Sequence, residues 1–320
     1  MILLYIAVFL LVAFIIFFLI FGYCVFRRVC LRKPARPDTF EATFSKSKLA
    51  VADNERLASD YEWFMNSKSS ELCVVSKDRK KLYASAVFSS SDQPKGVIIL
   101  FHGYRSSCVR DFCLQMRILH NAGYHLLVVD QHSHGRSEGK YICYGVRERE
   151  DVLLWSKAAR SFFGDSLPLC LMGLSMGAAT VIMSSALVDN NDTSIKCVVA
   201  DCPFSMPWDI VSHVLVRDHH LPKYPLMYFV NFWCRLLAHF SLKTISSEKA
   251  AASTHLPILV FHGEADDFVP TRFSLDIKNA ANDKVRLVTV PNAAHGESIY
   301  LDEALYTDEL FSFLDKNMKA

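Results

Sequence analysis

The chain opens with an unbroken apolar run: residues 1–26 contain no charged side chain, and Gly22 is the one residue outside the hydrophobic set. As a helix rising about 1.5 Å per residue, this run would extend about 39 Å, which exceeds the roughly 30 Å hydrocarbon core of a bilayer. It lacks the basic start, the short apolar core and the small-x-small cleavage site of a secretory signal peptide. The pattern predicts an uncleaved transmembrane anchor over residues 1–26, with a cleaved signal peptide as the alternative.

The pattern changes after residue 26. Residues 27–52 are basic and polar and contain Pro34 and Pro37, so they predict a juxtamembrane linker. Residues 53–65 then show the spacing of an amphipathic helix, which marks the start of a folded domain over residues 53–320.

Eight short apolar runs within this domain have the length and composition of buried strands. They cover residues 72–75, 82–88, 97–101, 125–129, 169–172, 197–200, 258–261 and 286–290. Helical spacing lies between most of them, at about 109–121, 145–163, 176–188, 272–280 and 301–316. The first two runs are close enough to form a hairpin, and the alternation after them predicts a mostly parallel sheet with helices on both faces. The fold class is therefore α/β, in a doubly wound layout.

One interval interrupts this alternation. About 55 residues separate Ala200 from Ile258, far more than a usual connection, and they are rich in aromatic side chains. We interpret residues 203–254 as a helical cap over the ends of the strands, in which the histidines, His213 among them, are solvated. A longer helical connection that packs on the sheet is the alternative.

The charge distribution bears on partners and topology. The formal net charge is +2, but all the basic residues before position 38 flank the apolar run, and the remainder carries 30 basic against 33 acidic residues. A folded domain without a basic excess argues against nucleic acid as a partner. By the positive-inside rule, the flank places the folded domain in the cytoplasm, with the extracellular side as the alternative. The flanking cations are Arg27, Arg28, Arg32, Lys33 and Arg36.

Candidate chemistry begins at Ser175. The sequence GLSMG places this serine between Gly173 and Gly177, after an apolar strand and before a helix rich in small residues. A serine nucleophile on a sharp strand-to-helix turn needs small neighbours, because the helix must pack close to the sheet.

A serine hydroxyl is a weak nucleophile, so it needs a base and an acid that orients the base. Acids follow the strand that ends at His262, and His295 lies on a loop after the next strand. Ser175, Asp266 and His295 thus give the order nucleophile, acid, histidine. Asp201, at the end of the strand before the cap, is the alternative acid.

These motifs resemble those of the α/β-hydrolase superfamily, and within it the serine esterases, lipases and related peptidases. The resemblance covers about residues 72–313 and rests on FHGY from Phe101, DQHSHGRSEG from Asp130, GLSMG from Gly173, HGEADDFVP from His262 and AAHG from Ala293. It implies an α/β-hydrolase fold with an eight-stranded sheet and a helical cap insertion, and its acid motif selects Asp266 over Asp267.

The resemblance also implies an oxyanion hole made by the backbone N–H groups of Tyr104 and Met176. It gives His102 a role in bracing the loop, with a second catalytic histidine as the alternative. It makes the loop that carries Asp130, His132 and His134 structural, with a metal site as the alternative.

The expected function is a membrane-anchored serine hydrolase that cleaves a carboxylic ester or thioester through an acyl-enzyme on Ser175, without metal or organic cofactor. The expected partners are a small, moderately hydrophobic ester and the membrane that holds residues 1–26. A serine peptidase, an acyltransferase and a non-catalytic membrane-tethered scaffold are the alternatives.

Overall fold

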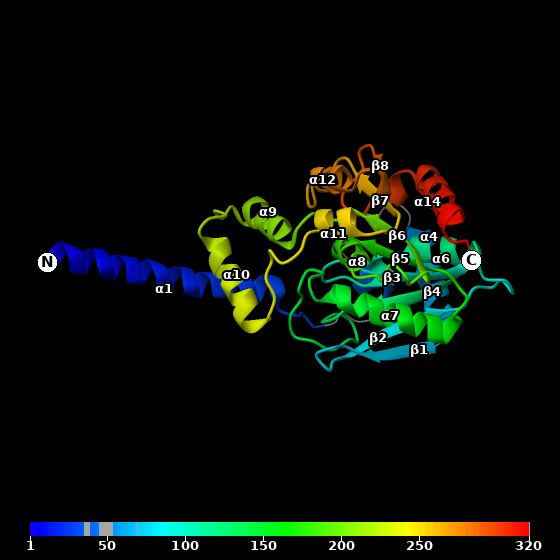
Figure 1. The fold of residues 1–320 in the computed structure, drawn as a ribbon, viewed down its shortest axis with the longest axis horizontal. Coiled ribbons are helices and arrows are strands. Elements are labelled where there is room, and N and C mark those ends of the chain that lie inside the picture. Colours follow the sequence, from blue (N-terminus) through cyan, green and yellow to red (C-terminus); the bar gives the residue numbers. More distant parts are fainter. Residues whose placement is uncertain (35–38, 45–53, 69, 320) are drawn as a thin grey trace.

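The computed structural model describes residues 1–34, 39–44, 54–68 and 70–319. The chain starts with a long helix, α1 (Ile2–Cys30), which projects away from the main body (Figure 1). Among the described helices, α1 alone is long and apolar enough to cross a membrane, as an anchor or as a signal sequence. Residues 1–17 are exposed, whereas Val25, Phe26 and Cys30 near the end of α1 are buried.

Eight strands form one sheet in the order β1-β2-β4-β3-β5-β6-β7-β8. They are β1 (Ser70–Val75), β2 (Lys81–Val87), β3 (Gly96–Phe101), β4 (Tyr124–Asp130), β5 (Leu169–Leu174), β6 (Ile195–Asp201), β7 (Ile258–Gly263) and β8 (Val285–Val290). β2 runs antiparallel to β1 and β4, and every pairing from β4 through β3 to β8 is parallel. The predicted hairpin and mostly parallel sheet are confirmed.

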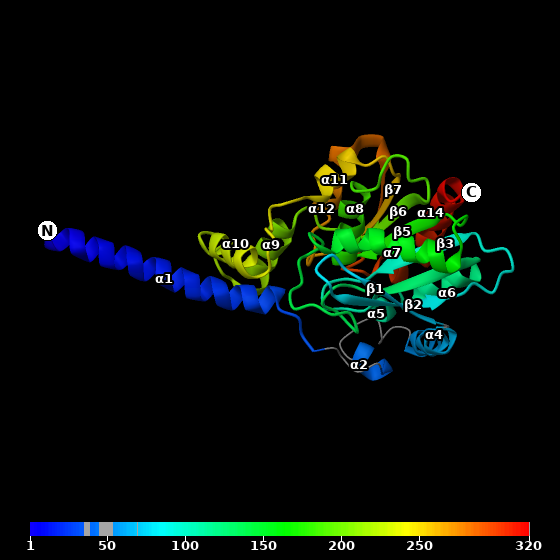
Figure 2. The same ribbon diagram turned by 60° about the horizontal axis from the view of Figure 1, so that its bottom comes forward.

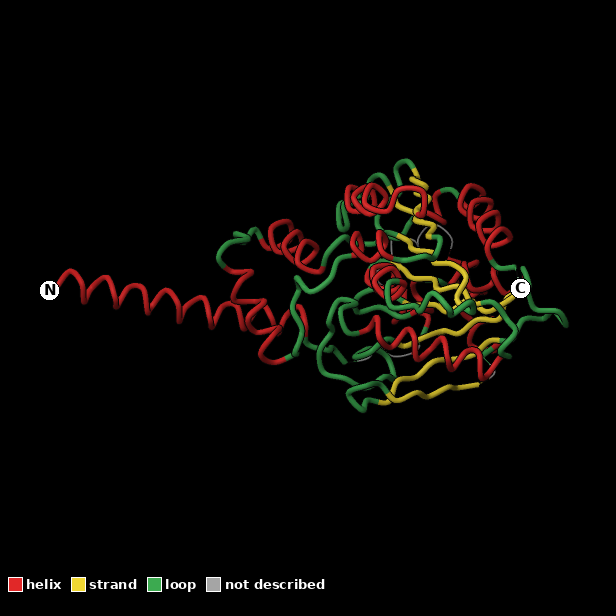
Figure 3. Tube along the Cα trace, viewed as in Figure 1, coloured by secondary structure: helices red, strands yellow, loops and turns green. Residues whose placement is uncertain are grey.

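Helices cover both faces of the sheet, as predicted (Figures 1 and 2), and Figure 3 shows them in red around the yellow strands. One face carries α7 (Glu148–Phe163), α8 (Met176–Ser185), α11 (Ser247–Ser253) and α12 (Arg272–Ala281), and the other carries α4 (Asn54–Ser67), α6 (Cys113–Asn121), α13 (Ser298–Leu301) and α14 (Glu303–Asn317). The connections also hold α2 (Phe40–Phe44), α5 (Cys108–Asp111) and the 3-10 turn η1 (Asn282–Lys284).

The central strands lie in the core because helices shield both of their faces. Every residue of β3 is buried. Its alternate side chains enter different clusters: Ile99 and Phe101 pack on the side of α7 and α8, and Ile98 and Leu100 pack on the side of α6 and α14. This packing on both faces holds the central strands in place, together with their carboxyl ends, where the candidate site lies.

The predicted cap divides into two parts. α9 (Pro207–His219) and α10 (Leu226–Leu237) lie beyond the carboxyl ends of the strands, and α10 packs beside α1 (Figure 2). α11 instead packs on α8 and α12, where buried Ala250 and Ala251 allow the helices to approach closely. Within the predicted interval 203–254, α9 and α10 therefore stand off the sheet, and α11 belongs to its helical layer.

The linker predicted from residue 27 begins too early. α1 continues to Cys30, and Arg32 donates hydrogen bonds of 2.6 Å to the carbonyl oxygens of Gly135 and Ser137. The end of α1 is thus part of the folded body, which the local polarity of the sequence does not reveal. Arg36 and the linker residues 35–38 and 45–52 lie outside the described residues, as does residue 53 of the next predicted helix.

Candidate active site

Ser175 occupies the turn between β5 and α8. Its backbone has φ 55° and ψ −113°, a left-handed conformation that a non-glycine residue adopts only under constraint. The Ser175 N–H donates to the carbonyl oxygen of Asp201 at 2.8 Å, which holds the turn against β6. A Cβ atom at Gly177 would overlap the carbonyl oxygen of Phe101, so this position has no room for a side chain. The turn presents the Ser175 hydroxyl at the carboxyl edge of the sheet.

His295 joins this serine to Asp266. Its Nε2 lies 3.0 Å from Ser175 Oγ, and its Nδ1 lies 2.7 Å from Asp266 Oδ2. An ionised carboxylate accepts hydrogen bonds only, so the proton resides on Nδ1 and the Nε2 lone pair faces the serine hydroxyl. The structure therefore brings together the three side chains that the sequence singled out, in the orientation that a general base requires.

Asp266 is buried and held in the ionised state. Its Oδ1 accepts the backbone N–H groups of Phe268 and Val269 at 3.0 and 2.8 Å, and His262 Nε2 lies 3.4 Å from Oδ2. Burial alone would raise the pKa of Asp266, but the hydrogen bonds from His262 and His295 outweigh it, and the pKa falls well below its usual range. The adjacent Asp267 has a side chain that is 90% exposed, so Asp266 is the acid that reaches the histidine.

Two backbone amides are candidates for oxyanion donors, since Met176 follows Ser175 and Tyr104 follows Gly103, at which a Cβ would lie 3.3 Å from Ser175 Cβ. Met176 is the first residue of α8, where a helix N–H has no partner within the helix, and Tyr104 follows the end of β3. Within the described parts of the chain, neither of these amides donates to a protein acceptor. The loop after β3, which carries Tyr104, is held by Asp111, whose Oδ2 accepts the Gly103 N–H at 2.6 Å. This arrangement can stabilise a negative oxygen next to Ser175.

A cysteine lies beside the histidine. Cys202 Sγ is 4.0 Å from His295 Nε2. Burial and the charges of Asp201 and Asp266 raise the pKa of the Cys202 thiol, so the thiol stays protonated and is not a competing nucleophile at neutral pH. Potential metal-ligand atoms of the described residues gather at Cys202, Asp266 and His295, within 4.8 Å of one another. Because Asp266 and His295 already bond to each other and the thiol is protonated, we assign no metal to this group.

Asp201, the alternative acid, is fully buried, and His295 bonds to Asp266 instead. Burial raises the pKa of Asp201 to about 6.

The other histidines have structural partners. The two ring nitrogens of His102 bond to the carbonyl of Gly103 and the N–H of Gln131, which matches the predicted bracing role. The loop after β4 sends its polar side chains to separate partners. His132 bonds to Asp151. His134 Nε2 accepts the N–H of Arg105. These side chains therefore do not converge on one point.

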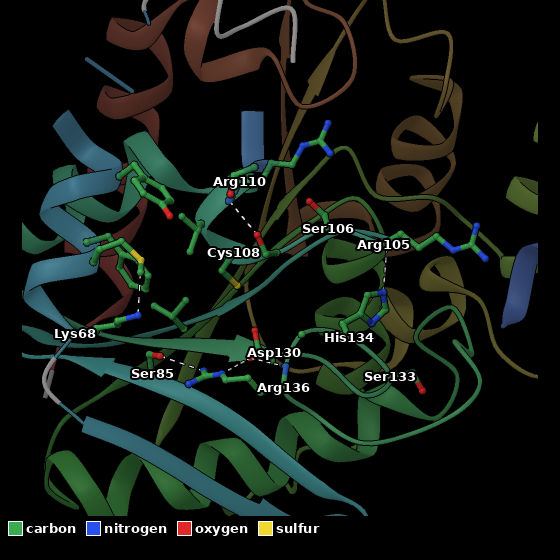
Figure 4. Close-up of a pocket in the computed structure, with 18 of the residues that line it drawn as sticks. Lys68, Ser85, Arg105, Ser106, Cys108, Arg110, Asp130, Ser133, His134 and Arg136 are labelled. Atoms are coloured by element: carbon green, nitrogen blue, oxygen red, sulfur yellow. Dashed lines mark hydrogen bonds and ion pairs between the residues drawn. The ribbon is translucent and has the colours of Figure 1, made fainter. Parts of the chain in front are cut away.

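Figure 4 shows a pocket, whose volume is about 310 Å³. Its walls come from α4, from the loop after β3 and from the loop after β4, and they include Lys68, Arg110 and Arg136. Arg136 Nε is paired with Asp130 Oδ2 at 2.8 Å. The described lining residues do not include Ser175, Asp266 or His295, so the pocket does not contain the triad.

Comparison with known proteins places the fold. The sequence family described as serine aminopeptidase, S33, matches residues 92–217. The uncharacterized protein YqkD of Bacillus subtilis is 23% identical over 224 residues, which cover 70% of this chain and 72% of the relative. Human protein ABHD12B is 23% identical over 203 residues, which cover 61% of this chain and 53% of the relative.

Among solved structures, the esterase Pf2001 of Pyrococcus furiosus superposes with a TM-score of 0.64 at 21% identity. The match covers 80% of this chain and 94% of the esterase. The chain has the α/β-hydrolase fold. The predicted fold class is thereby confirmed, and Ser175 stands where this α/β-hydrolase turns from β5 into α8.

Sequence reasoning missed three features of this α/β-hydrolase. Asp111, which holds the amide of Gly103, gave no motif signal. Cys202, which stands between Asp201 and Pro203, gave no motif signal either. The third is a contact of His213, which is half-buried and whose Nε2 lies 3.0 Å from the carbonyl oxygen of Asp267. Arg217, one turn further along α9, also donates to that oxygen, at 2.6 Å.

Proposed function

We propose that the protein is a membrane-anchored serine hydrolase that cleaves a carboxylic ester or thioester. The observation that carries the proposal is the continuous path from Asp266 Oδ2 through His295 to Ser175 Oγ, with links of 2.7 and 3.0 Å. Beside this path, we assign the oxyanion site to the amides of Tyr104 and Met176, which donate to no protein acceptor among the described residues.

The geometry supports a two-step reaction. Ser175 Oγ attacks the acyl carbon while His295 Nε2 takes the hydroxyl proton, and Asp266 stabilises the imidazolium that results. The amides of Tyr104 and Met176 donate to the negative oxygen of the tetrahedral intermediate. His295 then protonates the leaving alcohol or thiol, and an acyl-enzyme on Ser175 remains. A water activated by His295 releases the acid.

The end of α1 supports an anchor over a removed signal sequence. Phe26 and Cys30 are fully buried against the hydrolase body. Their loss would open the core, whereas signal peptides are removed from the mature protein. We propose that α1 crosses the bilayer and that the hydrolase lies on the cytoplasmic side, where the positive-inside rule places Arg27 and Arg28.

The aromatic side chains of α9 and α10, and their position beside the anchor, favour a moderately hydrophobic acyl group as the substrate. The family description as serine aminopeptidase supports a peptide bond as the second candidate. Both reactions use the same acyl-enzyme, so the experiment must separate the catalytic residues from the substrate class.

The test uses the full chain in lipid nanodiscs and p-nitrophenyl esters from acetate to palmitate. A fluorophosphonate probe measures the reactivity of Ser175 independently of substrate. Ser175→Ala and His295→Ala should abolish turnover and labelling, and Ser253→Ala, an exposed serine at the end of α11, should change neither. Labelling without ester turnover would favour a peptidase or an acyltransferase. Absence of both in the wild type would overturn the proposal and favour a scaffold.

A further inference from the structure

The last part of α1 packs along α10. The rings of Phe18 and Phe229 stack with centroids 5.6 Å apart, and Trp233 Nε1 donates to the carbonyl oxygen of Leu19 at 2.9 Å. Gly22 allows this approach, because a Cβ at that position would lie 2.6 Å from Phe229 Cβ. α10 is therefore held beside residues 18–30 of α1, as Figures 1 and 2 both show.

The length of α1 sets the depth of this contact. About 20 helical residues cross a hydrocarbon core of about 30 Å, and 20 residues counted from Ile2 end at Phe21. A span that instead extends to the first charged side chain, Arg27, carries Phe18 and Leu19 further into the bilayer. With either span, the contact of α1 with α10 lies at the boundary between acyl chains and headgroups or within the acyl-chain region.

The outward surface of α10 has the composition of such a boundary. Tyr228, Phe232 and Leu236 repeat every four residues along one face and are 55%, 46% and 51% exposed. Tyr224 lies before this stripe with Lys223 Nζ 5.5 Å from its ring. Aromatic and aliphatic side chains with lysine at the edge are typical of helices that lie in the membrane interface.

The joint between α1 and the hydrolase is rigid. The Tyr104 and Tyr144 hydroxyls donate to the carbonyl oxygen of Val29 at 2.6 and 3.0 Å. Arg105 Nη2 donates to the carbonyl oxygens of Arg28 and Leu31 at 2.6 and 3.0 Å. These bonds satisfy carbonyl groups that a helix leaves free at its end. The depth of α1 is therefore transmitted directly to α10.

We propose that the stripe of Tyr228, Phe232 and Leu236 is immersed in the bilayer leaflet beside α1, so that the hydrolase is seated on the lipid surface with a fixed orientation. The occupant of this apolar face is lipid. The proposal rests on the membrane crossing of α1 proposed above and is independent of the reaction catalysed.

The test measures depth by spin labelling of the full chain in phosphatidylcholine nanodiscs. Exposed Cys24 and Cys73 are replaced by serine, and a nitroxide is attached to cysteine at position 232, 9 or 88. Phe88 is the matched control, because it is 45% exposed, against 46% for Phe232. It follows β2 at the amino ends of the parallel strands, at the opposite end of the sheet from the candidate site. Collision with oxygen reports lipid, and collision with a water-soluble nickel chelate reports water.

For each label we compare the rate of collision with oxygen with the rate of collision with the chelate. The ratio of the two rates should be at least threefold higher at positions 232 and 9 than at position 88. A lipid signal at 9 with a water signal at 232 would overturn the proposal while leaving the anchor intact. Water signals at both positions would overturn the anchor and the proposal together.

A second measurement tests the packing of α1 on α10 inside the bilayer. Cys30 Sγ and Cys234 Sγ lie 3.8 Å apart and are buried. Copper phenanthroline, an oxidant, should convert this thiol pair to a disulfide in nanodiscs, which mass spectrometry of the linked peptides detects. Gly22→Leu keeps α1 apolar but cannot fit against Phe229, so it should lower the yield at least fivefold. A wild type that forms no Cys30–Cys234 bond in the bilayer would contradict the packing on which the proposal depends.

Discussion

Replacement of Asp266 by asparagine should inactivate the enzyme without unfolding it. The amide oxygen of the new side chain must take the place of Oδ1, because the N–H groups of Phe268 and Val269 donate there. The amide nitrogen then faces His295 Nδ1, 2.7 Å away in the wild type, and donates to it. The histidine proton moves to Nε2, which can no longer accept the proton of Ser175. The same tautomer change in a serine triad lowers kcat about 10⁴-fold, equivalent to about 5.4 kcal/mol of barrier.

The assay compares kcat for ester hydrolysis, and the rate of fluorophosphonate labelling, between Asp266→Asn and Asp267→Asn. Asp267 is the matched control, because its exposed carboxylate lies outside the path to His295 and its backbone carbonyl makes the stronger contact with Arg217. We expect the control to keep activity within about threefold of the wild type. Asp266→Asn that keeps a tenth of wild-type activity, or a control that loses as much as Asp266→Asn, would refute the assignment.

Three stability predictions follow, each measured as a melting temperature in detergent. The pKa of Asp201, raised to about 6 by burial, lies above its ordinary value, so the folded state binds more protons between about pH 4 and 6 and wild-type stability falls as pH rises through that window. Asp201→Asn removes this loss and should stabilise the protein by up to about 3 kcal/mol at pH 8 but little at pH 4; an equal gain at both pH values contradicts it. Gly177→Ala should lower the free energy of unfolding by about 3 kcal/mol or more, because the added Cβ meets the Phe101 backbone. At Gly164 an added Cβ meets no atom within 4 Å, so Gly164→Ala should cost only about 1 kcal/mol, from its φ of 122°. Phe26→Ala should cost about 3 to 5 kcal/mol, and exposed Phe9→Ala should cost almost nothing; equal losses would show that the end of α1 is not part of the core.

The strands could be predicted from sequence because helices bury both faces of the sheet, which leaves continuous apolar runs. The run at 97–101 differs from β3 by one residue. The helix predicted from Gly145 starts later, at Glu148. Gly145 has φ 84°, and the Glu148 carboxylate accepts the N–H groups of Cys143 and Gly145. This side-chain cap defines the start of α7 and is invisible to a hydrophobic pattern.

The order of Ser175, Asp266 and His295 could be predicted because each follows its own strand, and parallel strands bring their carboxyl ends to one edge. The groups that position them come from separate elements. Cys202 reaches His295 because β6 ends beside β7, and Arg217 reaches Asp267 because α9 folds back over the loop after β7. Neither contact leaves a motif, since it depends on how the elements pack.

If α1 and α10 lie in the bilayer as we propose, side-chain contacts connect the bilayer to the candidate active site. α10 is bound to α1, and α9 places Arg217 on the carbonyl of Asp267 and over the ring of Phe268, 4.9 Å from its centroid. Phe268 in turn packs edge-on against His295, with centroids 4.9 Å apart.

The hydroxyl of Tyr104, whose amide we assign to the oxyanion site, donates to the carbonyl oxygen of Val29 in α1. The base is therefore linked through α9 to α10, because Trp208 of α9 packs on Tyr228 of α10, and one proposed oxyanion donor, Tyr104, is bound to α1. We place α1 and α10 in the bilayer. Removal of the lipid should then lower kcat by disturbing the site itself, and not merely raise KM by diluting the substrate. A hydrolase joined to its anchor only by a flexible linker would show the rise in KM without the fall in kcat.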